Sequence, residues 1–173
     1  MKFGIILGST REGRVSPQVG EYVKNLAATQ EGHEFEIIDI LDYNLPFLGT
    51  GTPNQAWNEK IDSLDGYIFI TQEYNHGMSG ALKNAIDSAR EEWFNKAAGI
   101  VSYGSGGGIR AAEQLRLVLA EQKVAGVRTN PAFNLFTDFE NFSEFKPGEH
   151  MAQGVLDMFE ELITWAKALK TIR

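Results

Sequence analysis

The 173-residue sequence predicts one α/β domain, a three-layer sandwich in which a five-stranded parallel sheet has helices on both faces. Short apolar runs alternate along the chain with segments whose apolar residues recur at helical spacing. The run Lys2–Leu7 is almost unbroken, as expected for a parallel strand that is buried on both sides. Polar, glycine-rich loops follow several of these runs, and ligands of such sheets bind at the carboxyl ends of the strands.

The first half of the chain gives three strands and two helices. After the strand at 2–7, a helix is expected with Ser16 as its N-cap and Pro17 at its first helical position, and Gly32 is expected to end it. The next predicted elements are a strand at 35–40, an irregular segment at 41–58, a short helix at 57–64 and a strand at 66–71.

The second half continues the same alternation. No internal repeat or linker interrupts it, so residues 1–173 are predicted to form one domain. The predicted elements are a helix at 78–87, a strand at 97–101, a helix with Ala112, Leu115 and Leu119 on its inner face, a strand at 132–136, a loop at 139–147 and a helix at 151–169.

The composition argues against several classes of function. The formal charge of −7 argues against nucleic-acid binding. The sequence has no cysteine, which excludes disulfides and thiolate chemistry, and its three histidines show no metal-ligand spacing. No apolar stretch approaches the ~18 residues of a membrane span, and no signal peptide is evident. We therefore expect a cytoplasmic protein with no membrane partner.

The loop after the first strand predicts an anion site. It lies before a helix N-terminus, where free backbone N–H groups and the helix dipole favour negative charge. The spacing of Gly8 and Gly13 resembles a P-loop, but Arg14 and Val15 stand where that motif has Lys and Ser or Thr, which argues against nucleotide hydrolysis. A phosphate monoester fits better, although a solvated polar turn is the alternative. The candidate ligands are Ser9, Thr10, Arg11, Arg14 and Ser16.

Two further loops lie at strand ends. Gln72-Glu73-Tyr74-Asn75-His76-Gly77 follows the third strand, and Ser102-Tyr103-Gly104-Ser105-Gly106-Gly107-Gly108 follows the fourth. The glycines of the latter allow a flat ligand to approach backbone amides closely, and a flexible glycine turn is the alternative. A phosphate site with two loops for a ring edge is the arrangement that flavin mononucleotide (FMN) requires.

These residues resemble the flavodoxin-like NAD(P)H-dependent FMN reductases, which include quinone, chromate and azo-dye reductases. The resemblance extends from Met1 to about Leu119. Its motifs are Gly8-Ser9-Thr10-Arg11 with Gly13-Arg14, Glu73-Tyr74-Asn75-His76-Gly77 with Gly80-Ala81-Leu82-Lys83-Asn84-Ala85-Ile86-Asp87, and Ser102-Tyr103-Gly104 with Gly107.

The resemblance implies roles for particular residues. Ser9, Arg11 and Ser16 would hold the phosphate with help from Arg14, and backbone N–H groups of residues 72–75 would reach flavin N5 or O4. Donors from Ser105 to Gly107 would lie near N1 and O2. The full cofactor-binding set is Ser9, Thr10, Arg11, Arg14, Ser16, Gln72, Glu73, Tyr74, Asn75, Ser102, Tyr103, Gly104, Ser105, Gly106 and Gly107.

One residue departs from the family pattern. The family usually has proline before the glutamate, and this sequence has Gln72. Proline would fix the backbone and lack an N–H group, so glutamine at this position is expected to change the rigidity of the loop and its affinity for flavin.

The predicted function is transfer of a hydride from NADPH or NADH to FMN, and of electrons from FMN to a small acceptor such as a quinone, a flavin, an azo dye or chromate. FMN supplies this chemistry, so no side chain is assigned as a catalytic acid or base. The alternatives are an electron carrier resembling flavodoxin and a flavin-free binding module. The family also implies a homodimer or homotetramer, for which Trp93, Phe94 and Phe47 are candidate contact residues.

Overall fold

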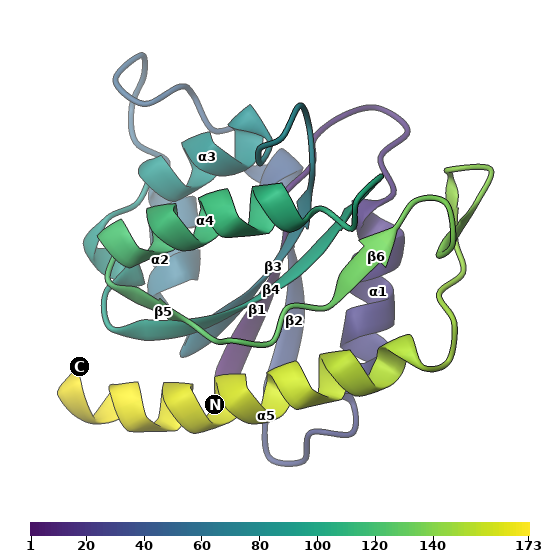
Figure 1. Ribbon diagram of the computed structural model, residues 1–173. Helices are drawn as coiled ribbons and strands as arrows, with labels where there is room; N and C mark the ends of the chain where they lie inside the picture. The colour runs from purple at the N-terminus through teal and green to yellow at the C-terminus, as the bar shows by residue number, and fades with distance from the viewer.

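A parallel sheet forms the centre of the computed structural model, which describes residues 1–173 (Figure 1). The strand order is β2-β1-β3-β4-β5, and β6 also pairs with β4. This is the flavodoxin-like order, and all of these pairings are parallel. The strands are β1 (Lys2–Leu7), β2 (Glu34–Asp39), β3 (Gly66–Gln72), β4 (Lys96–Gly104), β5 (Val124–Gly126) and β6 (Ala132–Asn134).

Helices cover both faces of the sheet. On one face lie α1 (Ser16–Ala27) and α5 (Met151–Leu169), and on the other lie α2 (Gln55–Asp62), α3 (Gly80–Asp87) and α4 (Ile109–Glu121), as Figure 1 shows. Short 3-10 helices occupy Ile40–Tyr43, Glu91–Trp93 and Lys170–Ile172. The predicted fold class and its two helical layers are confirmed.

Each face of the sheet has its own hydrophobic core because alternate side chains of a strand point to opposite faces. Ile68 and Ile70 of β3 pack towards α1 and α5, whereas Tyr67 and Phe69 pack towards α2, α3 and α4. The second core contains Trp57 and Trp93, whose rings lie 6.1 Å apart edge to face. Trp93 is fully buried in this core, so the expectation that it contacts another subunit is wrong.

The fifth strand differs from the prediction. Two short strands, β5 and β6, take its place, and both extend the sheet along β4. Between them, Val127 N–H donates to Ala98 C=O at 2.9 Å and Ser102 N–H donates to Pro131 C=O at 2.9 Å. Asn130-Pro131 thus separates the two strands without leaving the sheet edge.

Three other elements differ from the sequence-based prediction in their bounds or structure. Helix α1 begins at Ser16 itself, after Val15, and no side chain caps it. The predicted loop at 139–147 contains a small antiparallel hairpin, β7 (Phe139–Glu140) with β8 (Glu144–Phe145). Asn141 and Phe142 turn this hairpin with φ values of 50° and 56°. Helix α2 begins two residues earlier than expected, where Asn54 Oδ1 accepts from Trp57 N–H at 3.0 Å.

The carboxyl ends of β1, β3 and β4 meet at one edge of the sheet, where their loops gather at the top of Figure 1. The two chain ends lie at the lower side of the same view. None of the helices combines the length and the apolar composition that a bilayer crossing needs.

Candidate functional site

Three loops define the site: the first loop (residues 8–15, after β1), the second loop (residues 73–79, after β3) and the third loop (residues 105–108, after β4).

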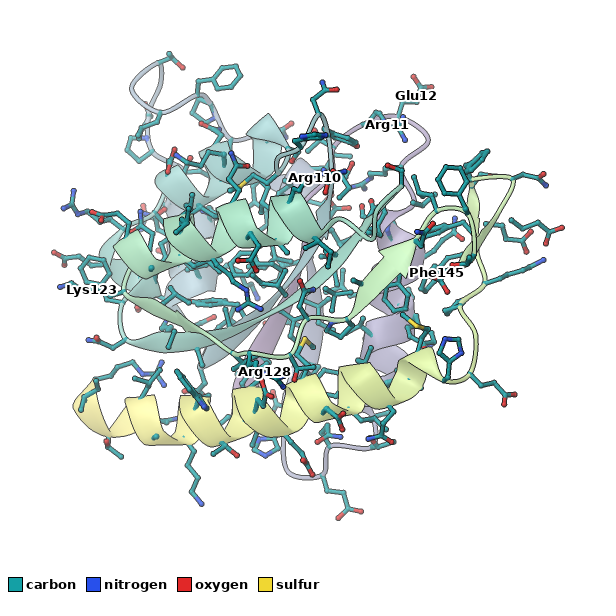
Figure 2. All side chains as sticks on the ribbon, in the orientation of Figure 1. Arg11, Glu12, Arg110, Lys123, Arg128 and Phe145 are labelled. Atoms are coloured by element: carbon teal, nitrogen blue, oxygen red, sulfur yellow. The ribbon has the colours of Figure 1, made fainter.

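Much of the backbone of the first loop has free hydrogen-bond donors. The N–H groups of residues 9–13 donate to no carbonyl of the protein. They lie directly before the N-terminus of α1, where an anion is favoured. Figure 2 shows Arg11 and Glu12 at the exposed tip of this loop.

The Ser16 hydroxyl supports an anion site independently of the helix. Ser16 is fully buried, and its Oγ has no hydrogen-bond partner in the protein. A buried hydroxyl without a partner is unfavourable, and natural proteins keep few of them. This hydroxyl is available to a ligand oxygen at the place where the sequence predicts a phosphate.

The two arginines of the first loop differ in their environment. Arg14 Nη1 donates to Asp39 Oδ1 at 2.7 Å and to Ser9 C=O at 2.5 Å, and its second nitrogen pairs with the other Asp39 oxygen. The hydrogen bonds to Asp39 raise the pKa of Arg14 above its ordinary value. Arg14 therefore fastens the first loop to the end of β2, and Arg11 is the guanidinium left unpaired.

Arg11 extends towards the second loop. Its guanidinium carbon lies 5.9 Å from the centre of the Tyr74 ring, within cation–π range, and it forms no ion pair. The Tyr74 hydroxyl lies 3.0 Å from Ser9 Oγ, so the same ring also bridges the two loops by a hydrogen bond. Tyr74 remains 37 % exposed, which leaves much of its ring available to a ligand.

The second loop is a tight turn. Tyr74 N–H donates to Gly77 C=O at 2.9 Å and Gly77 N–H donates to Tyr74 C=O at 3.1 Å, with Asn75 and His76 at φ values of 49° and 69°. Both central residues are left-handed, as in a type I′ turn, which favours asparagine at its first position. Because Tyr74 N–H is bonded within the turn, the free donors at its tip are the N–H groups of Asn75 and His76.

Glu73 holds the second loop against helix α4. Its carboxylate accepts from Arg110 N–H at 3.1 Å and from Arg110 Nε at 2.6 Å, and it is 6 % exposed. Glu73 N–H donates to Tyr103 C=O at 3.0 Å. Both its carboxylate and its N–H are therefore used inside the protein. In Figure 2 the Arg110 side chain reaches from the start of α4 towards this loop.

The backbone of the third loop lies close to the backbone of Tyr103. A Cβ atom at Gly108 would lie 2.7 Å from the Tyr103 backbone, and Gly107 and Gly108 have φ values of 73° and 72°. Only glycine fits both conditions at Gly108. The Ser102 hydroxyl is buried and donates to Gly107 C=O at 2.7 Å, so Ser102 shapes the loop from within.

Free donors also line the third loop. Gly107 N–H donates to Gly104 C=O at 3.1 Å, but the N–H groups of Ser105, Gly106 and Gly108 bond to no backbone carbonyl. A Cβ at Gly104 would come within 3.1 Å of Glu73 Cβ, so the second and third loops are packed directly together. A flat ring edge placed here would face unpaired N–H groups from both loops.

Tyr103 lies beneath the site. Its ring is 5 % exposed and packs against Phe139 at 5.8 Å in the core under α1 and α5. Burial raises the pKa of its phenol well above the ordinary value, and the neighbouring Tyr74 adds to this. The side chain is therefore a neutral group whose ring packs in the core and whose hydroxyl lies near Ser16 and Tyr74 at the loops.

Beside the first loop, Thr10 lines a cavity of ≈ 360 Å³. The cavity has five hydrophobic residues among the nine in its lining. It lies on the α3 side of the sheet, and the lining residues are Thr10, Ile40, Leu41, Asn44, Leu45, Phe47, Gly80, Ala81 and Asn84.

The sequence missed residues that support the site from a distance. Ser79 Oγ caps α3 by accepting from Leu82 N–H at 3.0 Å and donates to Gly8 C=O at 2.5 Å. Gln114 Oε1 on α4 accepts from Met78 N–H at 2.8 Å. A serine before an apolar helix is a recognisable N-cap signal, whereas nothing near Gln114 or Arg110 in the sequence points to the second loop.

Residues 1–138 match the family model of NADPH-dependent FMN reductases. An NAD(P)H-dependent FMN reductase of Schizosaccharomyces pombe is 33 % identical over 168 residues, covering 90 % of this chain and 78 % of the relative. An NAD(P)H:quinone oxidoreductase of Solanum tuberosum is 41 % identical over 99 residues, covering 50 % of each chain.

Among solved structures, the flavoenzyme NAD(P)H:(acceptor) oxidoreductase FerB of Paracoccus denitrificans superposes with a TM-score of 0.75 at 20 % identity. The superposition covers 96 % of this chain and 97 % of FerB, and it confirms the fold. The family match includes all three loops of the site, and the chain belongs to the NADPH-dependent FMN reductase family.

Proposed function

We propose that this protein is an FMN-dependent oxidoreductase that uses NAD(P)H to reduce a small acceptor of the quinone or azo class. When bound, FMN accepts a hydride from the nicotinamide and passes electrons to the acceptor. The family match and the names of the relatives support this activity. The observation that supports the cofactor most directly is the buried, unpartnered Ser16 hydroxyl beside the free N–H groups of the first loop.

The residues of the site fit the two ends of FMN. The N–H groups of residues 9–13, Ser16 Oγ and Arg11 would hold the phosphate, because they supply donors and one free positive charge. The free N–H groups of Asn75, His76, Ser105, Gly106 and Gly108 would face the ring edge. Donors at a ring edge stabilise negative charge on it, since they are already oriented.

The remaining side chains maintain the geometry. Arg14, Glu73 and Ser102 are engaged within the protein, and they fix the first, second and third loops respectively. No side chain in the site is required as a general acid or base. Arg14 remains a predicted phosphate ligand, and its hydrogen bonds to Asp39 and Ser9 C=O support a second role, which is to hold the first loop in place.

The test is the visible spectrum of the purified protein followed by anaerobic addition of NADPH, and then NADH. A yellow protein whose flavin absorbance bleaches is the expected result. A yellow protein that stays yellow with both nucleotides would indicate an electron carrier instead. A colourless protein that does not take up added FMN would refute the cofactor.

Assembly and location are further parts of this proposal. We propose a cytoplasmic homodimer or homotetramer, supported by the exposed side chains of Phe47 (73 %) and Leu48 (67 %) beside the site. Contiguous exposed apolar surface marks contact sites more than scattered single residues do. Sedimentation at low concentration is the test, and a monomer would refute the assembly.

A further inference from the structure

Gln72 connects two loops of the site through its side chain. It is the last residue of β3, directly before the second loop, and it is 2 % exposed. Its Nε2 donates at 2.9 Å to the carbonyl oxygen of Gly8, the first residue of the first loop. Gly8 itself donates its N–H to Ile70 C=O at 2.9 Å. The Gln72 amide thus joins the base of the second loop to the base of the first, beside the Ser79 hydroxyl, which also donates to the Gly8 oxygen.

The chemistry of the contact fixes the orientation of the amide. A carbonyl oxygen only accepts, so the NH₂ end of Gln72 must face Gly8 C=O. The Ser79 hydroxyl donates to the same oxygen at 2.5 Å, which occupies both of its lone pairs. The other end of the amide, Oε1, is buried and has no donor in the protein.

An unpartnered buried oxygen opposes folding, so packing alone would not select glutamine here. An apolar residue, or proline, would avoid that cost. Proline, however, has no side-chain donor and cannot reach Gly8 C=O. What glutamine adds at this position is the N–H bond to the first loop.

We propose that Gln72 is a positioning residue that sets the spacing between the phosphate loop and the ring loop, so that both ends of one FMN molecule are bound together. This inference rests on the proposed FMN function. Bound FMN would contact both the first and the second loop, so the two contacts would reinforce each other only when the loops are held at the right separation. A hydrogen bond in a buried setting is suited to that, because water does not compete for it.

A third link between the same loops is partly exposed to solvent. The Tyr74 hydroxyl and Ser9 Oγ are 3.0 Å apart, and Tyr74 is 37 % exposed. Water competes for this contact, so it contributes less to the spacing than the buried amide does. The buried Ser79 hydroxyl also caps α3, so its removal would disturb that helix as well, and the Gln72 bond is the one to remove in a test.

The experiment compares FMN with riboflavin, which has the same ring and ribityl chain but no phosphate. Dissociation constants are measured on flavin-free protein by quenching of flavin fluorescence, for the wild type and for Gln72→Met. We expect FMN affinity to fall about tenfold and riboflavin affinity to change little, so that the advantage of FMN over riboflavin shrinks about tenfold. Gln72→Pro, which also lacks the side-chain donor, is expected to show the same loss.

Gln114→Met is the matched control. Gln114 supports the second loop through Met78 N–H and does not contact the first loop. Its loss is expected to weaken both flavins equally and to leave their ratio unchanged. If Gln72→Met does not fold, as judged by thermal unfolding of the flavin-free protein, Gln72→Pro supplies the measurement.

The outcomes separate two failures. Wild-type protein that binds neither flavin would refute the proposed function and this inference with it. Wild-type protein that prefers FMN, together with Gln72 variants that lose both flavins equally or neither, would overturn the inference alone.

Discussion

Buried polar groups at the two ends of the sheet differ in their hydrogen bonding. At the amino end, Lys96 is 4 % exposed, and its Nζ donates to Ile61 C=O and Asp62 C=O, both at 2.9 Å. The Tyr67 hydroxyl and the Trp93 ring N–H also have carbonyl partners. At the carboxyl end, Ser16 Oγ and Gln72 Oε1 have none.

This contrast separates buried polar groups that stabilise the fold from those available to a ligand. A polar group buried for the sake of the fold is paired, because leaving it unpaired costs about 1–3 kcal/mol. Two of the three unpartnered buried side-chain atoms lie at the three loops, and the third is Asn58 Oδ1 on α2. At the amino end, Lys96, Tyr67 and Trp93 are paired within the protein, whereas Ser16 Oγ at the carboxyl end is open to the proposed phosphate. Changes at the two ends should therefore affect different measurements.

The largest effect on stability is expected from Trp93→Ala at the amino end. Trp93 is fully buried and its ring N–H donates to Ile86 C=O at 3.0 Å. Loss of the ring should lower the free energy of unfolding by about 3–5 kcal/mol, measured by urea denaturation of the flavin-free protein. FMN affinity of the folded fraction should stay close to that of the wild type. A stability loss below about 1 kcal/mol would contradict this assignment.

Arg11→Ala should have the opposite profile. Arg11 is exposed and has no ion pair, so the free energy of unfolding should change by less than about 0.5 kcal/mol. FMN affinity should fall by about 10- to 100-fold, as expected for loss of a charge-assisted hydrogen bond. Titration of flavin-free protein with FMN gives the affinity, and unchanged retention of FMN would refute the phosphate site. Riboflavin affinity, which does not depend on a phosphate, serves as the control.

Lys96 makes the amino end sensitive to pH. Burial lowers the pKa of Lys96 to about 8, below its value in the unfolded chain. Between these two pKa values the unfolded chain binds more protons, so this residue makes stability rise with pH above about 8. The slope is at most about 1.4 kcal/mol per pH unit for one proton. Urea denaturation between pH 7.5 and about 9.5 should show this rise in the wild type and its loss in Lys96→Met. Equal slopes would contradict the shifted pKa.

The smallest expected effects are those of Ser16→Ala, which should raise stability while it weakens FMN binding. These opposite changes make the variant the most diagnostic one. Ser16→Ala removes the unpartnered hydroxyl, so the flavin-free protein should become more stable by about 1 kcal/mol. FMN should bind about 5- to 10-fold more weakly because a phosphate donor is lost. Thermal unfolding and FMN titration of the same preparation measure both. A variant that is less stable without flavin would show that the hydroxyl serves the fold.

The sequence predicted the layers of the fold well, because buried parallel strands are continuous apolar runs and their helices have one apolar face. It also located the three loops, since the strand order brings their strands' carboxyl ends together. It could not predict which loop groups are already paired. Arg14 and Arg11 look alike in the sequence, and only the contact with Asp39, 25 positions away along the chain, distinguishes them.

The same limit explains the other differences. Glu73 is held by Arg110, 37 residues further along, so its carboxylate is used inside the protein. The hairpin at 139–145 depends on left-handed backbone at Asn141 and Phe142, and phenylalanine gives no local signal for that conformation. Long-range pairing and unusual backbone geometry are set by the assembled fold, which a local pattern does not contain.

The two buried indoles have a practical consequence. Trp57 and Trp93 are in contact inside one core, while Trp165 on α5 is 48 % exposed. Their fluorescence should therefore comprise a shielded component and a hydrated one. Because bound flavin absorbs light at the wavelengths that indoles emit, loading would dim this emission, whereas unfolding would shift it to longer wavelength. The protein thus contains its own optical reporter, in which cofactor release and loss of the fold give separate signals.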